Sequence, residues 1–308
     1  MRIATIGAGG VGGYFGARLM AAGADVTFIA RGSHLAALRT GGLRLESPKG
    51  DLHLTNVTAT DSPASVGAVD VVLVTVKMYD LESAAASLQP LLGPDTVVVT
   101  LQNGVEAVDV VARHVGREHV AGGVAYVAAV ITEPGTIRHT SLDALIFGEL
   151  DGRRSDRLAQ FEDICLRAGF DARVSDNIEI DLWSKFSRLS VFSGMTAVTR
   201  SPIGVLRNDP ALLAMLQAAC EETIRVGRAR GVGLPAALMG EILQMVTSLP
   251  HQAKASMLED LERGRRLELP WLSGAVVRIG REVGIPTPIH EFIATVLTPH
   301  INGAVRAA

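Results

Sequence analysis

Cysteine, aromatic residues, long apolar runs and basic runs are all scarce in this chain of 308 residues. There are 2 cysteines, Cys165 and Cys220, and neither has a second cysteine or a histidine at metal-ligand spacing. We therefore expect both to be reduced and buried, with no disulfide framework and no metal site. No apolar stretch reaches the roughly 18 residues that span a bilayer, and no signal-peptide pattern opens the chain. These absences favour a cytoplasmic protein.

Charge is balanced rather than concentrated. The formal net charge is −3 and the isoelectric point is near 6.2, so nothing indicates nucleic acid or an anionic membrane as a partner. The densest basic run, around Arg265, is flanked by carboxylates. Hydrophobic residues make up 48% of the chain, and its length is comfortable for two domains with large cores.

The first part of the chain alternates short β-branched runs with helix-like segments. Candidate helices lie at 11–22, 80–92 and 158–168, and candidate strands at 3–6, 25–30, 69–76, 96–101, 119–130 and 170–174. A turn at 133–136 precedes two short segments, around 137–139 and 145–147, which we expect to form a hairpin or adjacent edge strands. This alternation predicts an α/β domain, a Rossmann-type doubly wound sheet, over residues 1–176.

The second part of the chain has a different sequence pattern. Long segments with a period of 3.6 residues replace the β-branched runs, at 178–193, 210–231, 235–248, 270–283 and 289–301. Pro270 opens one of these segments, and Gly284 closes it. The pattern predicts an all-α C-terminal domain over residues 177–308.

A glycine-rich turn follows the first candidate strand directly, with the sequence Gly7-Ala8-Gly9-Gly10-Val11-Gly12. In strand–turn–helix context, the first glycine permits the tight turn and the second lets the backbone approach a pyrophosphate. The third lets helix and strand pack closely, and the N–H groups at the helix start face the phosphates. An ordinary glycine turn is the alternative. The order of elements favours a dinucleotide-binding site.

The end of the second candidate strand indicates which dinucleotide. An NAD site places a carboxylate there for the ribose 2′-OH, whereas an NADP site offers a cation. This strand ends in Arg31, followed by Ser33, with no carboxylate. A guanidinium can bind a 2′-phosphate through two hydrogen bonds, although a solvated surface arginine would look the same. We expect NADP(H).

Few residues of the helical half suit proton transfer to a forming alkoxide. Lys185 lies among apolar residues early in the first helix, where it is a candidate acid or, alternatively, a surface lysine paired with Asp181 at i,i+4. Glu268 lies just before Pro270, where a helix start favours a carboxylate. Asn103 is first of all part of a turn, but loops after strands of this fold meet ligands.

Taken together, these residues resemble the ketopantoate reductase (2-dehydropantoate 2-reductase) family over essentially the whole chain. The resemblance implies that residues 7–12 bind the NADP phosphates with Arg31, and that Lys77 lies near the cofactor. It implies Lys185 as the catalytic acid and Glu268 as the partner of the reacting hydroxyl or cofactor. It also implies Asn103 at the nicotinamide ribose and substrate, and Ser256 at the substrate carboxylate. The implied reaction is the NADPH-dependent reduction of a 2-oxo acid, ketopantoate to pantoate, in pantothenate biosynthesis.

Three substrate-facing positions depart from the family pattern. Where the family usually has asparagines four and eight residues after the catalytic lysine, this chain has Leu189 and Ser193. A further asparagine ahead of a glycine is replaced by Ile203. Fewer hydrogen-bond partners for a hydroxylated tail favour a more apolar 2-oxo acid as the alternative substrate.

Two further functions and two assembly states stay open at this point. The chain could be a sensor that binds NADP(H) without turnover, or another dehydrogenase on the same plan that oxidises sugar acids or forms opines. The apolar helical half is compatible with a homodimer and equally with a two-domain monomer.

Overall fold

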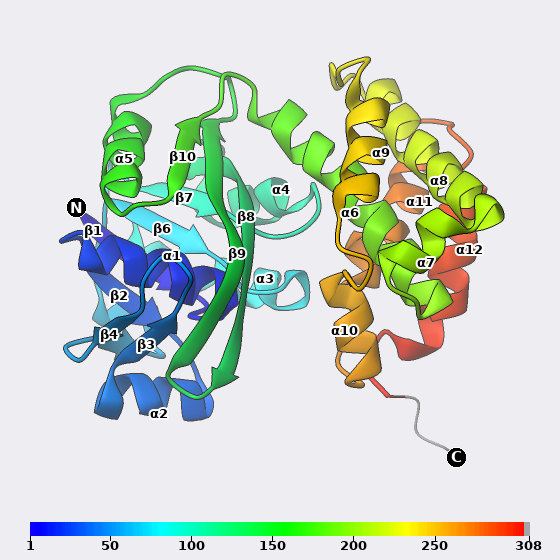
Figure 1. Ribbon diagram of the computed structural model, residues 1–308. Coiled ribbons are helices and arrows are strands. Elements are labelled where there is room, and N and C mark those ends of the chain that lie inside the picture. Colours follow the sequence, from blue (N-terminus) through cyan, green and yellow to red (C-terminus); the bar gives the residue numbers. More distant parts are fainter. Residues whose placement is uncertain (305–308) are drawn as a thin grey trace. The chain divides into compact units, whose positions relative to one another are not determined.

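The computed structural model describes residues 1–304, which separate into two compact units (Figure 1). The first comprises Met1–Gln102 and Glu106–Asp181 and contains all the strands. The second comprises Asn103–Val105 and the described chain from Leu182 onward, and it is helical. The prediction of an α/β sheet followed by a helical domain is therefore confirmed.

Four parallel strands form the centre of the first unit, in the order β2-β1-β6-β7. They are β1 (Arg2–Ile6), β2 (Asp25–Ile29), β6 (Val71–Val74) and β7 (Val97–Thr100). From Val71 to Val74 and from Val97 to Thr100 every residue is buried, as expected of parallel strands covered on both faces. The whole sheet has the order β4-β3-β9-β8-β7-β6-β1-β2-β5, with β10 also on β9. Its remaining short strands are β3 (Leu43–Glu46), β4 (Leu52–Leu54), β5 (Thr58–Thr60) and β10 (Asp171–Val174).

A long antiparallel hairpin makes this sheet mixed rather than purely parallel. β8 (Val120–Glu133) pairs with β9 (Thr136–Glu149), each 14 residues long. The two short segments expected around 137–139 and 145–147 are thus one continuous strand, and it is not an edge strand, because β3 and β10 pair with it. Polar residues between the two segments hid this continuity, and register shifts after Val127 and Ala128 absorb the irregularity.

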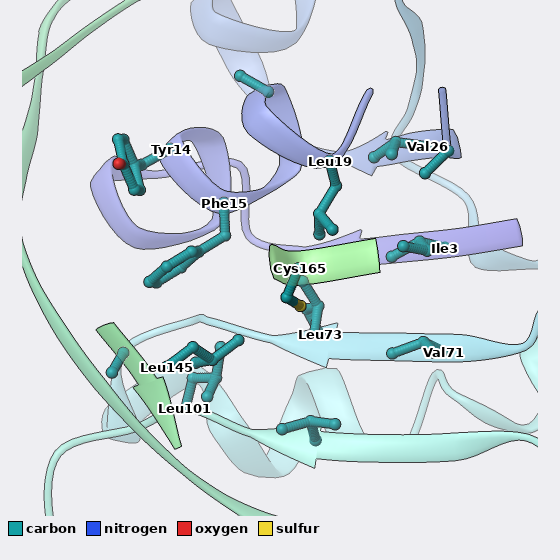
Figure 2. Packing of buried hydrophobic residues seen from close by; sticks show 14 of the residues in the cluster. Ile3, Tyr14, Phe15, Leu19, Val26, Val71, Leu73, Leu101, Leu145 and Cys165 are labelled. Atoms are coloured by element: carbon teal, nitrogen blue, oxygen red, sulfur yellow. The ribbon is translucent and has the colours of Figure 1, made fainter. Parts of the chain in front are cut away.

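Helix α1 (Gly10–Ala21) is buried deep in the first unit and contacts both the parallel strands and the hairpin. Tyr14, Phe15 and Leu19 are fully buried. Figure 2 shows them gathered with Ile3 of β1 and Leu73 of β6. The other helices of the unit are α2 (Gly32–Gly41), α3 (Met78–Ala85), α4 (Ala107–Val115) and α5 (Asp156–Arg167), with the short turns η1 (Pro63–Ser65), η2 (Gln89–Leu91) and η3 (Arg117–His119).

The expected helix at 80–92 is instead α3 followed by the separate turn η2, because Pro90 cannot donate a helical hydrogen bond.

The helical unit begins within α6 (Ile178–Thr199), which is longer than the segment expected at 178–193. It continues through α7 (Ile203–Asn208), α8 (Pro210–Ala229), α9 (Leu238–Ser248), α10 (Ser256–Glu262), η4 (Leu269–Trp271), α11 (Ser273–Glu282), α12 (Pro288–Leu297) and η5 (Thr298–His300). Pro270 belongs to η4 rather than to the start of α11. The backbone of Leu272, at φ −109° and ψ −103°, separates the two elements.

Both cysteines are buried and free, as predicted. Burial raises the pKa of the Cys220 thiol to about 12 and that of Cys165 well above its ordinary value, so both remain thiols. Among the described helices, none is both long enough and apolar enough to cross a membrane.

Candidate active site

The glycine loop after β1 is built from main-chain contacts. Gly7 has φ +95°, a conformation that favours glycine, and its N–H donates to the Ile29 carbonyl at 2.9 Å. The N–H of Gly9 donates back to the Gly7 carbonyl at 2.7 Å. A Cβ on Gly7 would lie 3.0 Å from the backbone nitrogen of Val76, the residue before Lys77. The tight turn expected of the first glycine is present.

Thr75, the residue directly after β6, fixes the same loop. Its Oγ1 lies 2.6 Å from the Gly7 carbonyl oxygen and 3.0 Å from that of Ile6, where the hydroxyl can donate. A Cβ on Gly12 would lie 2.4 Å from both the Gly7 oxygen and Thr75 Oγ1, so the third glycine permits the close helix–strand packing. The sequence analysis missed Thr75, whose only signal is a hydroxyl at the end of an apolar strand.

Gly9 and Gly10 have opposite surroundings. A Cβ on Gly10 would come within 1.9 Å of the Ala129 carbonyl oxygen, because β8 passes directly over the start of α1. A Cβ on Gly9 would meet nothing within 4 Å. The loop is therefore closed by the hairpin at Gly10 and open at Gly9, beside the N–H groups of the first helical turn that lack intrahelical partners. An anionic group can approach there.

Two cationic residues follow strands that flank β1. Arg31 precedes the first turn of α2, directly after β2, and is exposed. Lys77 precedes α3, after β6, and is part-buried. Because β1, β2 and β6 are parallel neighbours, both residues lie at the carboxyl ends of the strands, on the side of the sheet where Gly7 begins the loop. Ligands of open α/β sheets bind at these carboxyl ends.

Lys185 is positioned by the buried face of α6. Trp183 and Phe186 are buried and pack edge to face at 5.4 Å, and a Cβ on Gly227 of α8 would lie 2.8 Å from the Trp183 ring. These contacts set the rotation of the helix about its axis. They leave Lys185 in a part-buried position.

Burial lowers the pKa of Lys185 to about 8. The Glu268 carboxylate opposes this shift, whereas the Arg188 guanidinium adds to it. Glu268 itself is 5% exposed and immediately precedes η4. Asp181, the partner in the alternative expectation of a surface ion pair, accepts hydrogen bonds from Arg173 and Ser175. The pKa of Lys185 therefore depends on burial first and on the neighbouring charges of Glu268 and Arg188 second.

The Asn103-Gly104 turn lies against η4, next to Glu268. Gly104 has φ +108°, and a Cβ there would be 3.0 Å from the Trp271 carbonyl oxygen, so glycine permits the approach. The preceding Gln102 is buried and anchors the end of β7, because its Nε2 donates to the Val74 carbonyl at 2.8 Å. Asn103 is part-buried.

The remaining predicted substrate residues differ in exposure. Leu189 is part-buried, one helical turn after Lys185, and Ser256 is exposed at the start of α10. Ser193 is fully buried, and its hydroxyl makes no hydrogen bond within the described chain. Ile203 is also fully buried, and its N–H donates to the Ala253 carbonyl at 3.0 Å, which places it beside the segment that leads to Ser256.

Within residues 1–304, no group of three or more His, Cys, Asp or Glu side chains could hold a metal ion.

Comparison with known proteins identifies the class to which this fold and these residues belong. The family described as "Ketopantoate reductase PanE/ApbA" matches residues 3–152, and its C-terminal family, "Ketopantoate reductase PanE/ApbA C terminal", matches residues 177–300. The chain therefore belongs to the ketopantoate reductase PanE/ApbA family.

Similar proteins support this assignment over nearly the full length. The 2-dehydropantoate 2-reductase of Mesorhizobium japonicum is 34% identical, with 94% of each chain covered. The crystal structure of a PanE/ApbA family ketopantoate reductase from Ralstonia eutropha JMP134 is similar with a TM-score of 0.90 and 34% identity, covering 98% of each chain. A D-mandelate dehydrogenase solved with NADH and anilino(oxo)acetate has a TM-score of 0.88 over 98% of each chain, but at 22% identity it shares the fold alone.

Proposed function

We propose that this protein reduces a 2-oxo acid to a 2-hydroxy acid with NADPH, with ketopantoate as the first candidate substrate and pantothenate synthesis as its setting. The observation that carries the proposal is Lys185, a part-buried lysine whose pKa is about 8 and depends in part on the charge of Glu268. A functional group of this kind suits proton donation near neutral pH. Family membership supports the same reaction.

The chain's residues fit a dinucleotide in the first unit. The open space at Gly9 accepts the pyrophosphate, while the free N–H groups at the start of α1 donate to it. Arg31 binds the 2′-phosphate, and Lys77 lies near the cofactor from the neighbouring strand. The dinucleotide, when bound, supplies the hydride.

Lys185 acts on the keto oxygen of the substrate. At pH 7 a lysine with a pKa of about 8 is mostly protonated, so its ammonium donates a hydrogen bond and then a proton as the oxygen gains charge. Glu268 stabilises the protonated form and engages the reacting hydroxyl or the cofactor. Asn103 contacts the nicotinamide ribose and the substrate, and Ser256 holds the substrate carboxylate.

Leu189 favours a second candidate within the same reaction class, a 2-oxo acid with a more apolar tail. It is part-buried one turn after Lys185, where it can contact a substrate tail but cannot hydrogen-bond it. The buried Ser193 and Ile203 offer the tail no exposed polar atom. A tail hydroxyl without a partner is penalised on burial, whereas an apolar group is favoured.

The experiment that tests the function is an NADPH-oxidation assay with ketopantoate, its analogue lacking the tail hydroxyl, and branched and aromatic 2-oxo acids. We expect turnover of at least one of them. NADPH binding with no turnover of any 2-oxo acid would favour the sensor. Reduction of NADP⁺ by sugar acids alone, or oxidation of NADPH only with amino acid–oxo acid pairs, would favour the other dehydrogenases.

The cofactor preference is tested by Arg31→Ala. Charge-assisted hydrogen bonds from Arg31 to a 2′-phosphate contribute roughly 1.5–3 kcal/mol, so NADPH should bind about ten- to more than a hundredfold more tightly than NADH. The variant should weaken NADPH by most of that factor and leave NADH nearly unchanged, as measured by fluorescence titration. Equal affinities for the two dinucleotides in the unaltered protein would contradict the NADP(H) assignment.

A further inference from the structure

His34 connects three segments that build the proposed dinucleotide site. It lies in the first turn of α2, three residues after Arg31, and its Nδ1 accepts from the Gly135 N–H at 3.1 Å. Gly135 belongs to the turn that joins β8 to β9. The same β8 covers Gly10 of the glycine loop.

The turn at Gly135 is held by contacts with Arg44 of β3 and Ala37 of α2. The Gly135 carbonyl accepts from the Arg44 N–H at 2.9 Å, and a Cβ on Gly135 would lie 3.2 Å from the Ala37 side chain. Gly135 has φ +83° and is buried, so the turn is pressed against α2 with little room to shift. The imidazole of His34 is the side chain that joins α2 to this turn by a hydrogen bond.

The ring is held in one neutral form. Because Nδ1 accepts from an N–H, the ring proton is on Nε2. Burial lowers the pKa of His34, and the backbone of Ala8 in the glycine loop partly opposes the shift. Nε2 is buried and makes no hydrogen bond within the described chain.

We propose that His34 is a positioning residue for the cofactor: it holds the start of α2, and with it Arg31, at a fixed place relative to the glycine loop. The inference rests on the proposed NADP(H) site. Loss of His34 should therefore weaken the binding of NADPH but not of NADH, because a misplaced Arg31 affects only a ligand that carries a 2′-phosphate. A merely structural histidine would affect NADPH and NADH equally.

The test is a double-mutant cycle on dinucleotide affinity with His34→Ala, Arg31→Ala and the double variant. We expect His34→Ala to weaken NADPH about five- to tenfold, as for loss of one hydrogen bond, and to leave NADH about unchanged. In the Arg31→Ala background, removing His34 should no longer change the ratio of the two affinities.

Conservative variants distinguish the two ring nitrogens. His34→Asn retains an acceptor near the place of Nδ1 and should restore most of the NADPH preference. His34→Gln places its amide near Nε2, too far along the side chain to accept from the Gly135 N–H, and should restore little. His53→Ala is the matched control, because His53 is exposed on β4 and its Nε2 lies 3.4 Å from the Gly41 carbonyl oxygen, at the opposite end of α2 from Arg31. It should behave as the unaltered protein, and thermal melts verify that each variant is folded.

The results can separate failure of the His34 role from failure of the proposed NADP(H) site. An unaltered protein without NADPH preference would overturn the Arg31 assignment, and with it this role of His34. A preference that survives His34→Ala, or an equal loss of both dinucleotides, would overturn the role of His34 alone.

Discussion

The two units use different parts of the chain for function. In the α/β unit, glycines let backbone approach backbone, as at Gly7, Gly10 and Gly12, so that main-chain groups form the proposed dinucleotide site. In the helical unit, the proposed proton-transfer residues are side chains, the part-buried Lys185 and the buried Glu268. A site made of main-chain groups depends little on the neighbouring side chains, but it requires glycine wherever a Cβ would clash with the backbone. Side-chain chemistry depends on burial and charge at single residues.

The interior of the helical unit continues this contrast with a cluster of buried polar groups. The Glu222 carboxylate accepts from the N–H groups of Ile289 and His290 at 2.8 and 3.0 Å and so caps α12 from α8. His290 is fully buried, and its Nε2 lies 3.0 Å from the Ala219 carbonyl oxygen and 2.8 Å from Thr223 Oγ1. In this cluster, buried polar side chains stabilise the packing of α8 against α12.

The largest expected effect is that of Lys185→Ala in the helical unit. Positioned general acids contribute about 10²–10⁴-fold, so kcat should fall by that factor while NADPH affinity stays unchanged. In the unaltered protein the rate should fall as pH rises above about 8, because the acid must be protonated. Steady-state kinetics against pH measure both. Undiminished turnover in the variant would remove Lys185 from the mechanism.

The next largest effect concerns the stability of the helical unit against pH. Burial lowers the pKa of His290 to about 4, whereas an unfolded histidine titrates near 6.5. Between these values the unfolded state binds more protons, so stability is complete above about pH 6.5 and decreases by up to roughly 3 kcal/mol as pH falls to about 4.

Urea unfolding of the unaltered protein and of His290→Gln at several pH values isolates this contribution. The variant should show a flatter pH dependence. Glu222 acts in the opposite direction, since burial raises its pKa, but it is present in both proteins. Identical pH slopes would show that His290 does not limit stability.

A smaller effect separates folding from binding within the glycine loop. Gly10→Ala forces a Cβ against the Ala129 carbonyl, and overpacking of this kind typically costs about 1–3 kcal/mol, so the melting temperature should fall. Gly9→Ala is the matched variant, because nothing lies within 4 Å of its Cβ. It should melt close to the unaltered protein yet bind NADPH more weakly, since the methyl group occupies the space for the pyrophosphate. Unimpaired NADPH binding by Gly9→Ala would locate the phosphates elsewhere.

The smallest effect is expected at Leu189. An asparagine there can hydrogen-bond a tail hydroxyl, and such a bond contributes about 1 kcal/mol. Leu189→Asn should therefore shift kcat/KM about fivefold toward ketopantoate relative to the analogue without the tail hydroxyl. The ratio of the two specificity constants is the measurement, and the exposed Val205→Asn is a control that should leave it unchanged. A strong preference for ketopantoate in the unaltered protein would contradict the apolar-tail hypothesis.

The sequence by itself determined the glycine loop, the central parallel strands and the change to helices. These features depend on local steric rules and on periodicities that are visible over a few residues. Gly7 needs a positive φ and Gly12 a missing side chain, whatever the rest of the chain does. Lys185 and Glu268 could be named from their motifs as well.

Only the tertiary structure decided how these residues are held. The hairpin of β8 and β9 covers Gly10 from more than a hundred residues further along the chain, and no local pattern shows that contact. Thr75 fixes the glycine loop, and His34 joins α2 to the turn between β8 and β9, through hydrogen bonds between distant segments. The pKa of Lys185 and the burial of Ser193 depend on desolvation, which is set by everything that packs around a side chain and by no single neighbour in sequence.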